Sequence, residues 1–203
     1  MKDIKEFESQ INELEKQFKS ATKVKAEMVE PETPAQEEAE YTVPSLLSPT
    51  LKVALMRGLT QELVQASLWK SLANQMQKCG YFGTQKYFLK ESEEELGHYQ
   101  IIVDFFNDLG DMAEVPAIEA PTAKAEEIGD ALVIAYNKEV EVYNLYKELY
   151  AIAQAEDSVV AQFLLQFLQI QKEAVGAYGD LIATYRTANR TGEILEFDEN
   201  ING

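Results

Sequence analysis

Apolar residues recur every three or four positions over four long stretches of the chain, a period typical of amphipathic α-helices. The stretches cover about residues 49–78, 84–109, 125–154 and 159–186. No strand-like alternation of useful length competes with this period, and most glycines and prolines lie outside the stretches. The pattern therefore predicts an all-α chain built on four long helices.

The segments between these stretches predict how the helices are connected. Ser48 followed by Pro49 is typical of a helix start, with the serine as N-cap and the proline in the first turn. The turn over residues 79–83 is so short that the first two helices must be antiparallel neighbours. Residues 110–123 form the longest break and can run the height of a bundle. We expect a four-helix bundle over residues 49–186 with one long crossover.

Three further segments flank the predicted bundle. Residues 1–25 predict a short amphipathic helix, because its apolar residues follow a heptad pattern: Ile4, Phe7, Ile11, Leu14, Phe18 and Ala21. This helix either lies on its own domain or associates with another copy or a partner protein. Residues 26–48 are rich in Glu and Pro and contain no Lys or Arg, which indicates an extended acidic linker. Residues 187–203 are polar, and we expect an irregular tail.

Composition narrows the possible partners and compartments. The 203 residues include 35 acidic and 18 basic ones, giving a net charge of −17, which argues against nucleic acid and against an anionic membrane. No apolar run approaches the roughly 20 residues that cross a bilayer. A single cysteine excludes an intramolecular disulfide, and the N-terminus carries charges where a signal peptide would be apolar. We expect a cytoplasmic protein with cations as its ligands.

The candidate chemistry centres on the segment Glu93–His98, which contains the only histidine of the chain. Glu95 and His98 are three residues apart, so on a helix they lie on one face and can reach one metal ion. Carboxylate and imidazole together suit iron, manganese or zinc. Taken alone, such a pair is more typical of an exposed acidic turn, so its interpretation depends on distant partners.

Two further glutamates lie among apolar residues at core spacing. Glu62 is flanked by Leu59, Leu63 and Ala66, and Glu139 follows Ala135 and Tyr136. Both are therefore expected at the core seam, although most glutamates on helices face solvent. We assign four neighbouring glutamates to solvated faces: Glu93, Glu94, Glu141 and Glu148.

Four segments, each on a different predicted helix, resemble motifs of the ferritin family. They are Glu62–Trp69, Glu93–His98, Tyr136–Glu139 and Gln171–Ala174, the last followed by Gly179-Asp180. The separation of Glu62 and Glu95 is also the one that bacterial ferritins show. The resemblance covers roughly residues 50–186 and implies a ferritin-like up-down-down-up four-helix bundle.

By this resemblance, the site is a di-iron centre with two irons per subunit. Glu62 and His98 would hold the first iron, Glu95 would bridge the pair, and Glu139 would complete the second iron. Gln171 would orient a water or an oxygen species beside the metals. An oxygen-rich ligand set with a single nitrogen suits Fe²⁺ and Fe³⁺.

The implied function is a ferroxidase that oxidises Fe(II) with O2 or peroxide and stores the product within a homo-oligomer. Haem is not expected, because Leu96 stands where bacterioferritins carry a haem-ligating methionine. Trp69 replaces a ferritin tyrosine, which puts the electron-donating role of that tyrosine in doubt. The segment Gly192–Phe197 is short for the fifth helix that closes ferritin cages, so the subunit could assemble differently.

Two other interpretations stay open at this point. One is a structural or interaction subunit whose bundle is tethered to a partner assembly by residues 1–25. The other is a di-metal oxidase of an organic substrate, although a single histidine counts against it.

Overall fold

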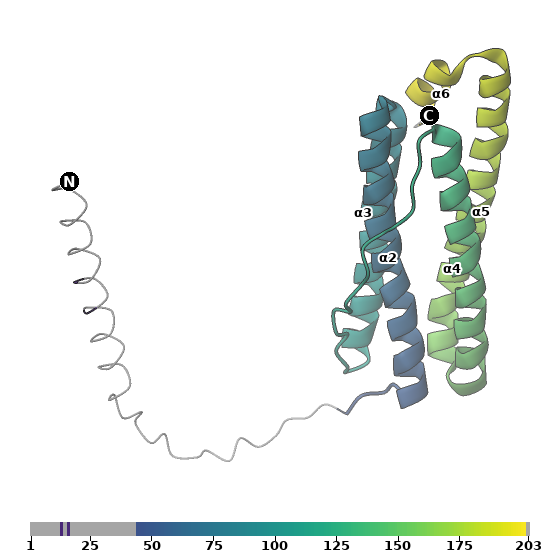
Figure 1. The fold of residues 1–203 in the computed structure, drawn as a ribbon. Coiled ribbons are helices and arrows are strands. Elements are labelled where there is room, and N and C mark those ends of the chain that lie inside the picture. Colours follow the sequence, from purple (N-terminus) through teal and green to yellow (C-terminus); the bar gives the residue numbers. More distant parts are fainter. Residues whose placement is uncertain (1–12, 14–15, 17–43, 202–203) are drawn as a thin grey trace. The chain divides into compact units, whose positions relative to one another are not determined.

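The computed structural model describes residues 13, 16 and 44–201 of the chain. Residues 43–203 form one compact unit, and residues 1–42 belong to another. Five helices in the first of these units carry the labels of Figure 1: α2 (Pro49–Cys79), α3 (Phe82–Asp108), α4 (Ile128–Glu156), α5 (Ser158–Thr191) and α6 (Ile194–Asn200). No strand occurs among the described residues. The predicted all-α fold is confirmed.

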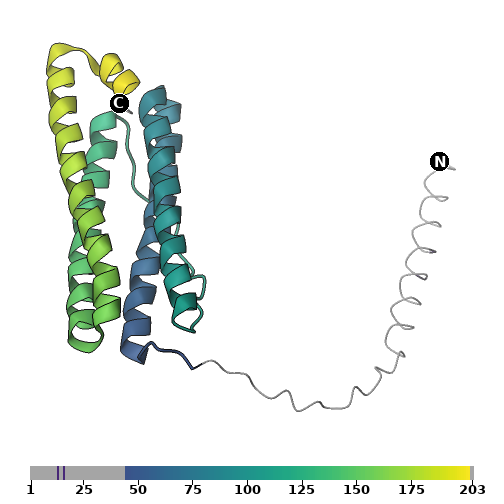
Figure 2. The same cartoon turned by 180° about the vertical axis from the view of Figure 1, so that it is seen from behind.

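The four long helices form an up-down-down-up bundle (Figure 1). Helix α2 pairs with α3, α4 pairs with α5, and the two pairs meet mainly through α2 and α4. The segment between α3 and α4 has no helix and runs along the bundle from one end to the other, as both views show (Figures 1 and 2). The predicted single long crossover is therefore confirmed, and it follows from the loop's length.

Helix α2 begins and ends where its sequence predicts. The Ser48 side chain accepts a hydrogen bond from the backbone N–H of Leu51, and Pro49 opens the helix. Gly80 ends it with φ of 89°, a left-handed conformation that glycine adopts at little cost. Because α3 starts immediately afterwards, the two helices are held antiparallel.

The chain just before α2 is part of the bundle. Leu46 donates its backbone N–H to the carbonyl of Leu109, and Ser45 donates to the Asp111 carboxylate at 2.8 Å. Lys52 pairs with the same carboxylate at 2.6 Å. The last residues of the linker predicted over 26–48 are thus fixed to the α3 end. The sequence does not reveal this attachment, because nothing in it indicates which residues of the bundle these ones contact.

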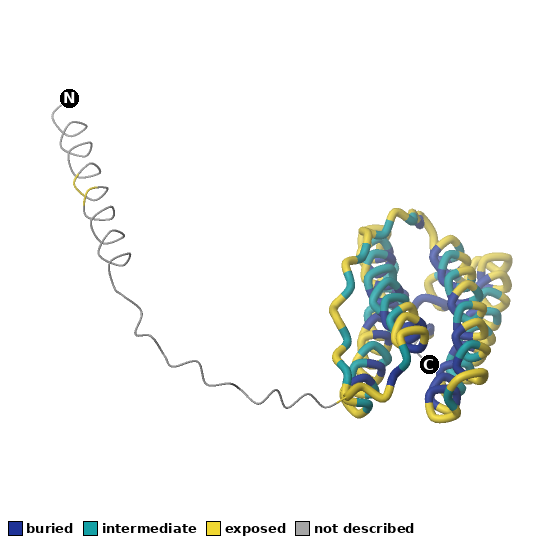
Figure 3. The backbone as a smooth tube through the Cα atoms, turned by 90° about the horizontal axis from the view of Figure 1, so that it is seen from below, coloured by how far each residue is buried: buried dark blue, intermediate teal, exposed yellow. Residues whose placement is uncertain are grey.

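The apolar core consists of two clusters separated by a polar layer. Along α2, Leu51, Leu55 and Leu59 belong to one cluster, and Trp69 and Leu72 belong to the other. The other three long helices also contribute residues to both clusters. Viewed along the bundle, buried residues line the inner faces of the helices and exposed ones the outer faces (Figure 3). Each of the four long helices crosses the polar layer between its two apolar segments.

The irregular tail expected over residues 187–203 is wrong for most of its length. Helix α5 continues to Thr191, and α6 then packs across α3 and α5 at one end of the bundle (Figure 2). The Asp198 carboxylate accepts hydrogen bonds from the backbone N–H of Gly83 and of Thr84, and from the Thr84 hydroxyl. An acidic side chain that looked solvent-exposed in sequence is in fact a buried cap on the start of α3.

The predicted helix over residues 1–25 and most of the linker lie outside the described residues. Among the helices that the structure describes, none combines the length and apolar character that a membrane span needs.

We predict that Gly83→Ala releases α6 from the bundle. A Cβ at this position would overlap the backbone carbonyl of Asp198, which cannot move without displacing the helix. Asp198→Ala should act in the same direction and lower the free energy of unfolding by about 2–3 kcal/mol, since charged hydrogen bonds are lost. Hydrogen exchange over residues 194–200 measures the release. Glu199→Ala, an exposed neighbour, should leave exchange unchanged, and slow exchange in Gly83→Ala would contradict this prediction.

Candidate metal centre

The polar layer consists of side chains at core positions of the four long helices. On α2, Glu62 and Gln65 continue the spacing that runs from Leu59 to Trp69, and both are fully buried. Each of the other three long helices supplies a buried polar residue to the same set: Glu95 from α3, Glu139 from α4 and Gln171 from α5. The helical period therefore directs these side chains inward as firmly as it directs the leucines.

Glu62, Glu95 and His98 form a compact cluster. One potential ligand atom from each residue lies within 4.8 Å of the other two. His98 Nδ1 lies 3.0 Å from Glu95 Oε2 and 3.4 Å from Glu62 Oε2. The ring of Phe167 meets the imidazole edge to face, with centroids 6.0 Å apart. The imidazole nitrogen and two carboxylate oxygens thus face one another.

Glu139 joins the cluster through Gln65. The amide nitrogen of Gln65 donates to Glu139 Oε1 at 3.1 Å and to Glu95 Oε1 at 3.3 Å. One amide group therefore bridges the carboxylates of α3 and α4. Among the described residues, nothing donates a hydrogen bond to the buried atoms Glu139 Oε2 and Gln65 Oε1. Glu62 Oε2, also buried, lies 3.4 Å from His98 Nδ1.

Two aromatic side chains also donate hydrogen bonds to carboxylates of the cluster. The Tyr146 hydroxyl donates a short hydrogen bond to Glu62 Oε1, and its ring stacks on Phe167 with centroids 5.1 Å apart. The Trp69 indole N–H donates to Glu95 Oε1 at 3.2 Å. Trp69 is a buried core residue, as its helical spacing predicts, and it also fixes the orientation of a carboxylate.

Burial controls the protonation of this cluster. Loss of hydration raises the pKa of Glu62 to about 8, opposed by the hydrogen bond with His98. Loss of hydration and the charge of Glu95 raise the pKa of Glu139 to about 8. For His98, burial lowers the pKa, but the hydrogen bonds and charges of Glu62 and Glu95 outweigh it and raise the pKa to about 10. Without a cation, the cluster therefore retains protons.

This retention of protons indicates a cation site. Three buried carboxylates share a single imidazole, and Glu139 Oε2 has no hydrogen-bond donor in the described part of the chain. A divalent ion would replace the retained protons and supply the missing positive charge. Carboxylate oxygens with one imidazole nitrogen fit iron or manganese, and zinc less specifically.

A fourth carboxylate lies close to this cluster. Glu91, one turn before Glu95 on α3, accepts a hydrogen bond from the Tyr178 hydroxyl at 3.1 Å. Burial, together with the charge of Glu94, raises the pKa of Glu91 to about 7. No part in the site was predicted for Glu91, although its spacing from Glu95 places it on the same helix face.

The structure separates buried from exposed polar residues as the sequence analysis expected. Glu93, Glu94, Glu141 and Glu148 are all exposed. Three glutamines lie close together on α5: Gln166 and Gln169 are exposed, and Gln171 is 1% exposed. Gln171 Oε1 finds no hydrogen-bond partner among the described residues.

Two residues of the cluster were missed. Gln65 and Tyr146 are fully buried and donate to the carboxylates, but neither was assigned a role. The helical spacing from Glu62 to Gln65 to Trp69 was a usable signal for the glutamine. Tyr146 offered none, because its contact with Glu62 depends on how α4 packs against α2.

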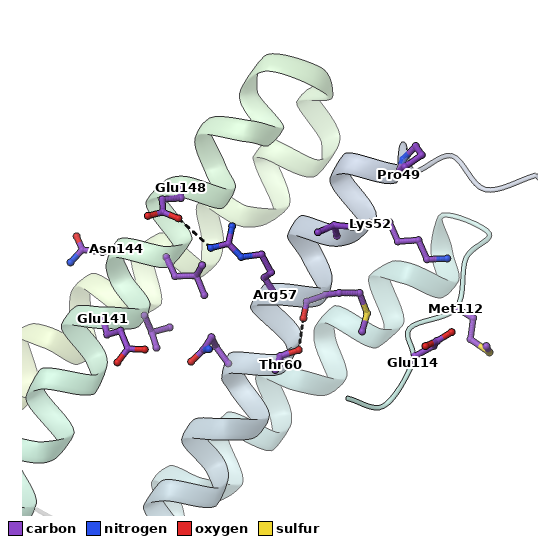
Figure 4. A pocket seen from close by; sticks show the side chains of 14 residues that line it. Pro49, Lys52, Arg57, Thr60, Met112, Glu114, Glu141, Asn144 and Glu148 are labelled. Carbon is purple, nitrogen blue, oxygen red and sulfur yellow. Dashed lines mark hydrogen bonds and ion pairs between the residues drawn. The ribbon is translucent and has the colours of Figure 1, made fainter. Parts of the chain in front are cut away.

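A cavity lies away from this cluster, on the outer face between α2 and α4 (Figure 4). It has a volume of about 950 Å³, and Arg57 of α2 pairs with Glu148 of α4 at 3.3 Å across its edge. None of the residues that line it belongs to the carboxylate and histidine cluster.

An all-helical bundle with acidic and histidine ligands inside is the architecture of di-metal carboxylate proteins.

Comparison with known proteins identifies the family. The sequence model of the Ferritin-like domain matches residues 53–188. A bacterial non-heme ferritin of Staphylococcus aureus is 31% identical over 133 residues, which cover 64% of this chain and 80% of that protein. Another, from Staphylococcus haemolyticus, is 29% identical over 129 residues, covering 63% of this chain and 78% of that protein. The chain therefore belongs to the ferritin family, in its non-haem branch.

Solved structures agree with this assignment. An open pore ferritin of the archaeon Archaeoglobus fulgidus has a TM-score of 0.72 and 25% sequence identity. The similarity covers 75% of this chain and 96% of that one. An engineered closed form of the same archaeal ferritin gives the same TM-score over 94% of its chain.

The raised pKa values of the cluster predict how metal-free protein responds to pH. Glu62, Glu139 and His98 all have a higher pKa when folded, so the folded state binds more protons than the unfolded state. Stability should therefore fall as pH rises from 6 to 9, by on the order of 2 kcal/mol for each of the two glutamates. Urea unfolding of chelator-treated protein measures this slope.

The control for this prediction is a pair of variants. Glu62→Gln combined with Glu139→Gln should make the slope shallower, because of the three groups only His98 then titrates. Glu94→Gln removes an exposed carboxylate and should leave the slope as in the wild type. Stability that rises with pH over this range would contradict the assigned directions.

We also predict that Tyr146→Phe weakens the metal-free fold by about 1–3 kcal/mol. The variant keeps the ring stacked on Phe167 but leaves Glu62 Oε1 buried without a donor. Tyr143→Phe, a half-buried tyrosine on the same helix, serves as the control and should change stability by less than about 0.5 kcal/mol. Equal effects of the two substitutions in denaturant unfolding would contradict the role of the hydroxyl.

Proposed function

We propose that this protein is a ferroxidase that oxidises Fe(II) at a di-iron centre. The protein forms a homo-oligomer and stores the oxidised iron within it. The observation that carries the proposal is the buried cluster of Glu62, Glu95 and His98, whose ligand atoms lie within 4.8 Å of one another. Membership of the ferritin family and relatives named bacterial non-heme ferritins support iron as the metal.

In this proposal, each candidate residue has a distinct role. Glu62 and His98 hold the first Fe(II), and Glu95, whose Oε2 lies 3.0 Å from the imidazole, bridges to the second. Glu139 binds the second ion through its oxygen without a donor. Gln171 positions a water or an oxygen species beside the ions, using a buried amide oxygen that is likewise free.

The reaction needs electrons and protons in balance. Two Fe(II) ions would give one electron each to O2, which takes up two protons and leaves as hydrogen peroxide. With hydrogen peroxide as the oxidant, two electrons and two protons would cleave its O–O bond and give two water molecules. The retained protons of Glu62 and Glu139 are released when the ions bind, as metal binding to titratable ligands requires. The surrounding apolar clusters keep other reductants and bulk water away from the reacting pair.

The two alternative functions find less support. An oxidase acting on an organic substrate needs a cavity beside its metals, and the cavity of about 950 Å³ is lined by other residues. A tethered structural subunit would not need buried carboxylates, which destabilise a bundle without a cation. Its attachment through residues 1–25 lies outside the described part of the chain.

We predict that His98→Ala and Glu95→Ala each slow rapid Fe(II) oxidation by at least about 100-fold. Each variant removes a proposed ligand, while the apolar clusters that hold the helices remain. Anaerobic Fe(II) titration, followed by addition of O2 and optical detection of Fe(III), measures stoichiometry and rate. Circular dichroism should show wild-type helicity.

The matched control is Glu94→Ala, which removes the exposed carboxylate next to Glu95 and should oxidise iron at the wild-type rate. Binding of fewer than two Fe(II) ions per wild-type chain, or fast oxidation in both ligand variants, would overturn the proposed centre.

A further inference from the structure

Gln65 occupies a central position in the polar layer that the proposed ligand set does not explain. Its side chain is fully buried, on the same face of α2 as Glu62 and one turn further along. Its amide nitrogen donates to Glu95 Oε1 and Glu139 Oε1 at 3.3 and 3.1 Å. A neutral amide thus joins the two carboxylates assigned to the second ion.

The other end of this amide has no partner. Gln65 Oε1 is buried and accepts no hydrogen bond from the described residues. A buried amide oxygen without a donor costs about 1–3 kcal/mol, so a glutamine used only to bridge two acids would be expected to find one. An unpartnered oxygen beside two carboxylates indicates that the side chain has a second use.

We propose that Gln65 is a ligand of the second metal ion, which it binds through Oε1. When no ion is bound, the NH2 group lies between Glu95 and Glu139 and offsets their repulsion. When the ion binds, rotation of the terminal amide exchanges nitrogen for oxygen without moving the helix. The amide then presents a neutral, hard oxygen to a cation that both carboxylates share.

The charges of the layer favour this exchange. Glu139 has one oxygen tied to Gln65 and one without a donor, and Glu95 Oε1 also accepts from the Trp69 indole. An ion between these residues would replace the weak hydrogen bonds from one NH2 group with a full positive charge. The amide nitrogen cannot stay, because its hydrogens would point at a cation. Release of the nitrogen and binding through the oxygen are therefore one event.

This inference rests on the proposed function, since it requires a second ion, and its test reads equilibrium binding instead of turnover. The probe is Co²⁺, which prefers the same oxygen and nitrogen ligands as Fe²⁺ and is not oxidised by air during the titration. Calorimetric titration of the full-length, metal-free protein gives the number of ions and each affinity. The visible absorption of Co²⁺ reports a change of ligands.

We predict that Gln65→Met weakens binding of the second Co²⁺ by about 10- to 100-fold and changes the first by less than about threefold. Methionine keeps the length of the side chain and removes both polar atoms. Gln65→Glu supplies a carboxylate oxygen at the same place and should restore or exceed wild-type affinity. Gln61→Met, the preceding glutamine outside the cluster, should bind two ions like the wild type.

The outcomes separate the two proposals. If the wild type binds two ions and Gln65→Met binds the second as tightly or more tightly, Gln65 is only a spacer and this inference is wrong, while the di-iron centre stands. If the wild type binds fewer than two ions, the di-iron centre itself is overturned. If Gln65→Met does not fold, Gln65→Glu decides alone, because failure to bind at least as tightly as the wild type contradicts a ligand role.

Discussion

The burial of carboxylates between two apolar clusters is the constraint on which the rest of this structure depends. Glu62 and Glu139 are almost fully buried, and a charged group in such a place is costly unless it is paired. The chain offers one imidazole against three acids. Retained protons or bound cations can therefore stabilise the layer, and the function proposed above uses exchange between the two.

The hydrogen bonds of the layer are arranged around this exchange. Tyr146, Trp69 and Gln65 each donate to Oε1 of a glutamate, so one oxygen is held in place. The opposite oxygen of Glu62 lies 3.4 Å from His98 Nδ1, and that of Glu139 has no donor in the described part of the chain. Neutral donors that hold one oxygen orient the other toward the cluster without competing for the cation. The hydrogen bonds from the same donors lower the free-energy cost of burying these carboxylates when no metal is bound.

The rest of the bundle keeps four helices in register around this layer. The cap at Ser48, the turn at Gly80 and the contact between Asp198 and the start of α3 fix the ends of helices whose middles carry the polar layer. A shift of α3 by one turn would move Glu95 out of reach of Glu62. Because helix ends are held by specific hydrogen bonds, the polar layer keeps its geometry even when its charge changes.

The sequence alone determined the four helices, their connections and, apart from Gln65, the main polar residues at core positions. The 3.6-residue period is a local property, so it placed Glu62, Glu95 and Glu139 on inner faces and Glu94 and Glu141 on outer ones. Only the tertiary structure decided which groups meet across helices. The donation from Tyr146 to Glu62, the bridge made by Gln65 and the cap formed by Asp198 each join residues far apart in sequence. Such contacts depend on the rotation and offset of packed helices, and the period of a single helix carries no information about them.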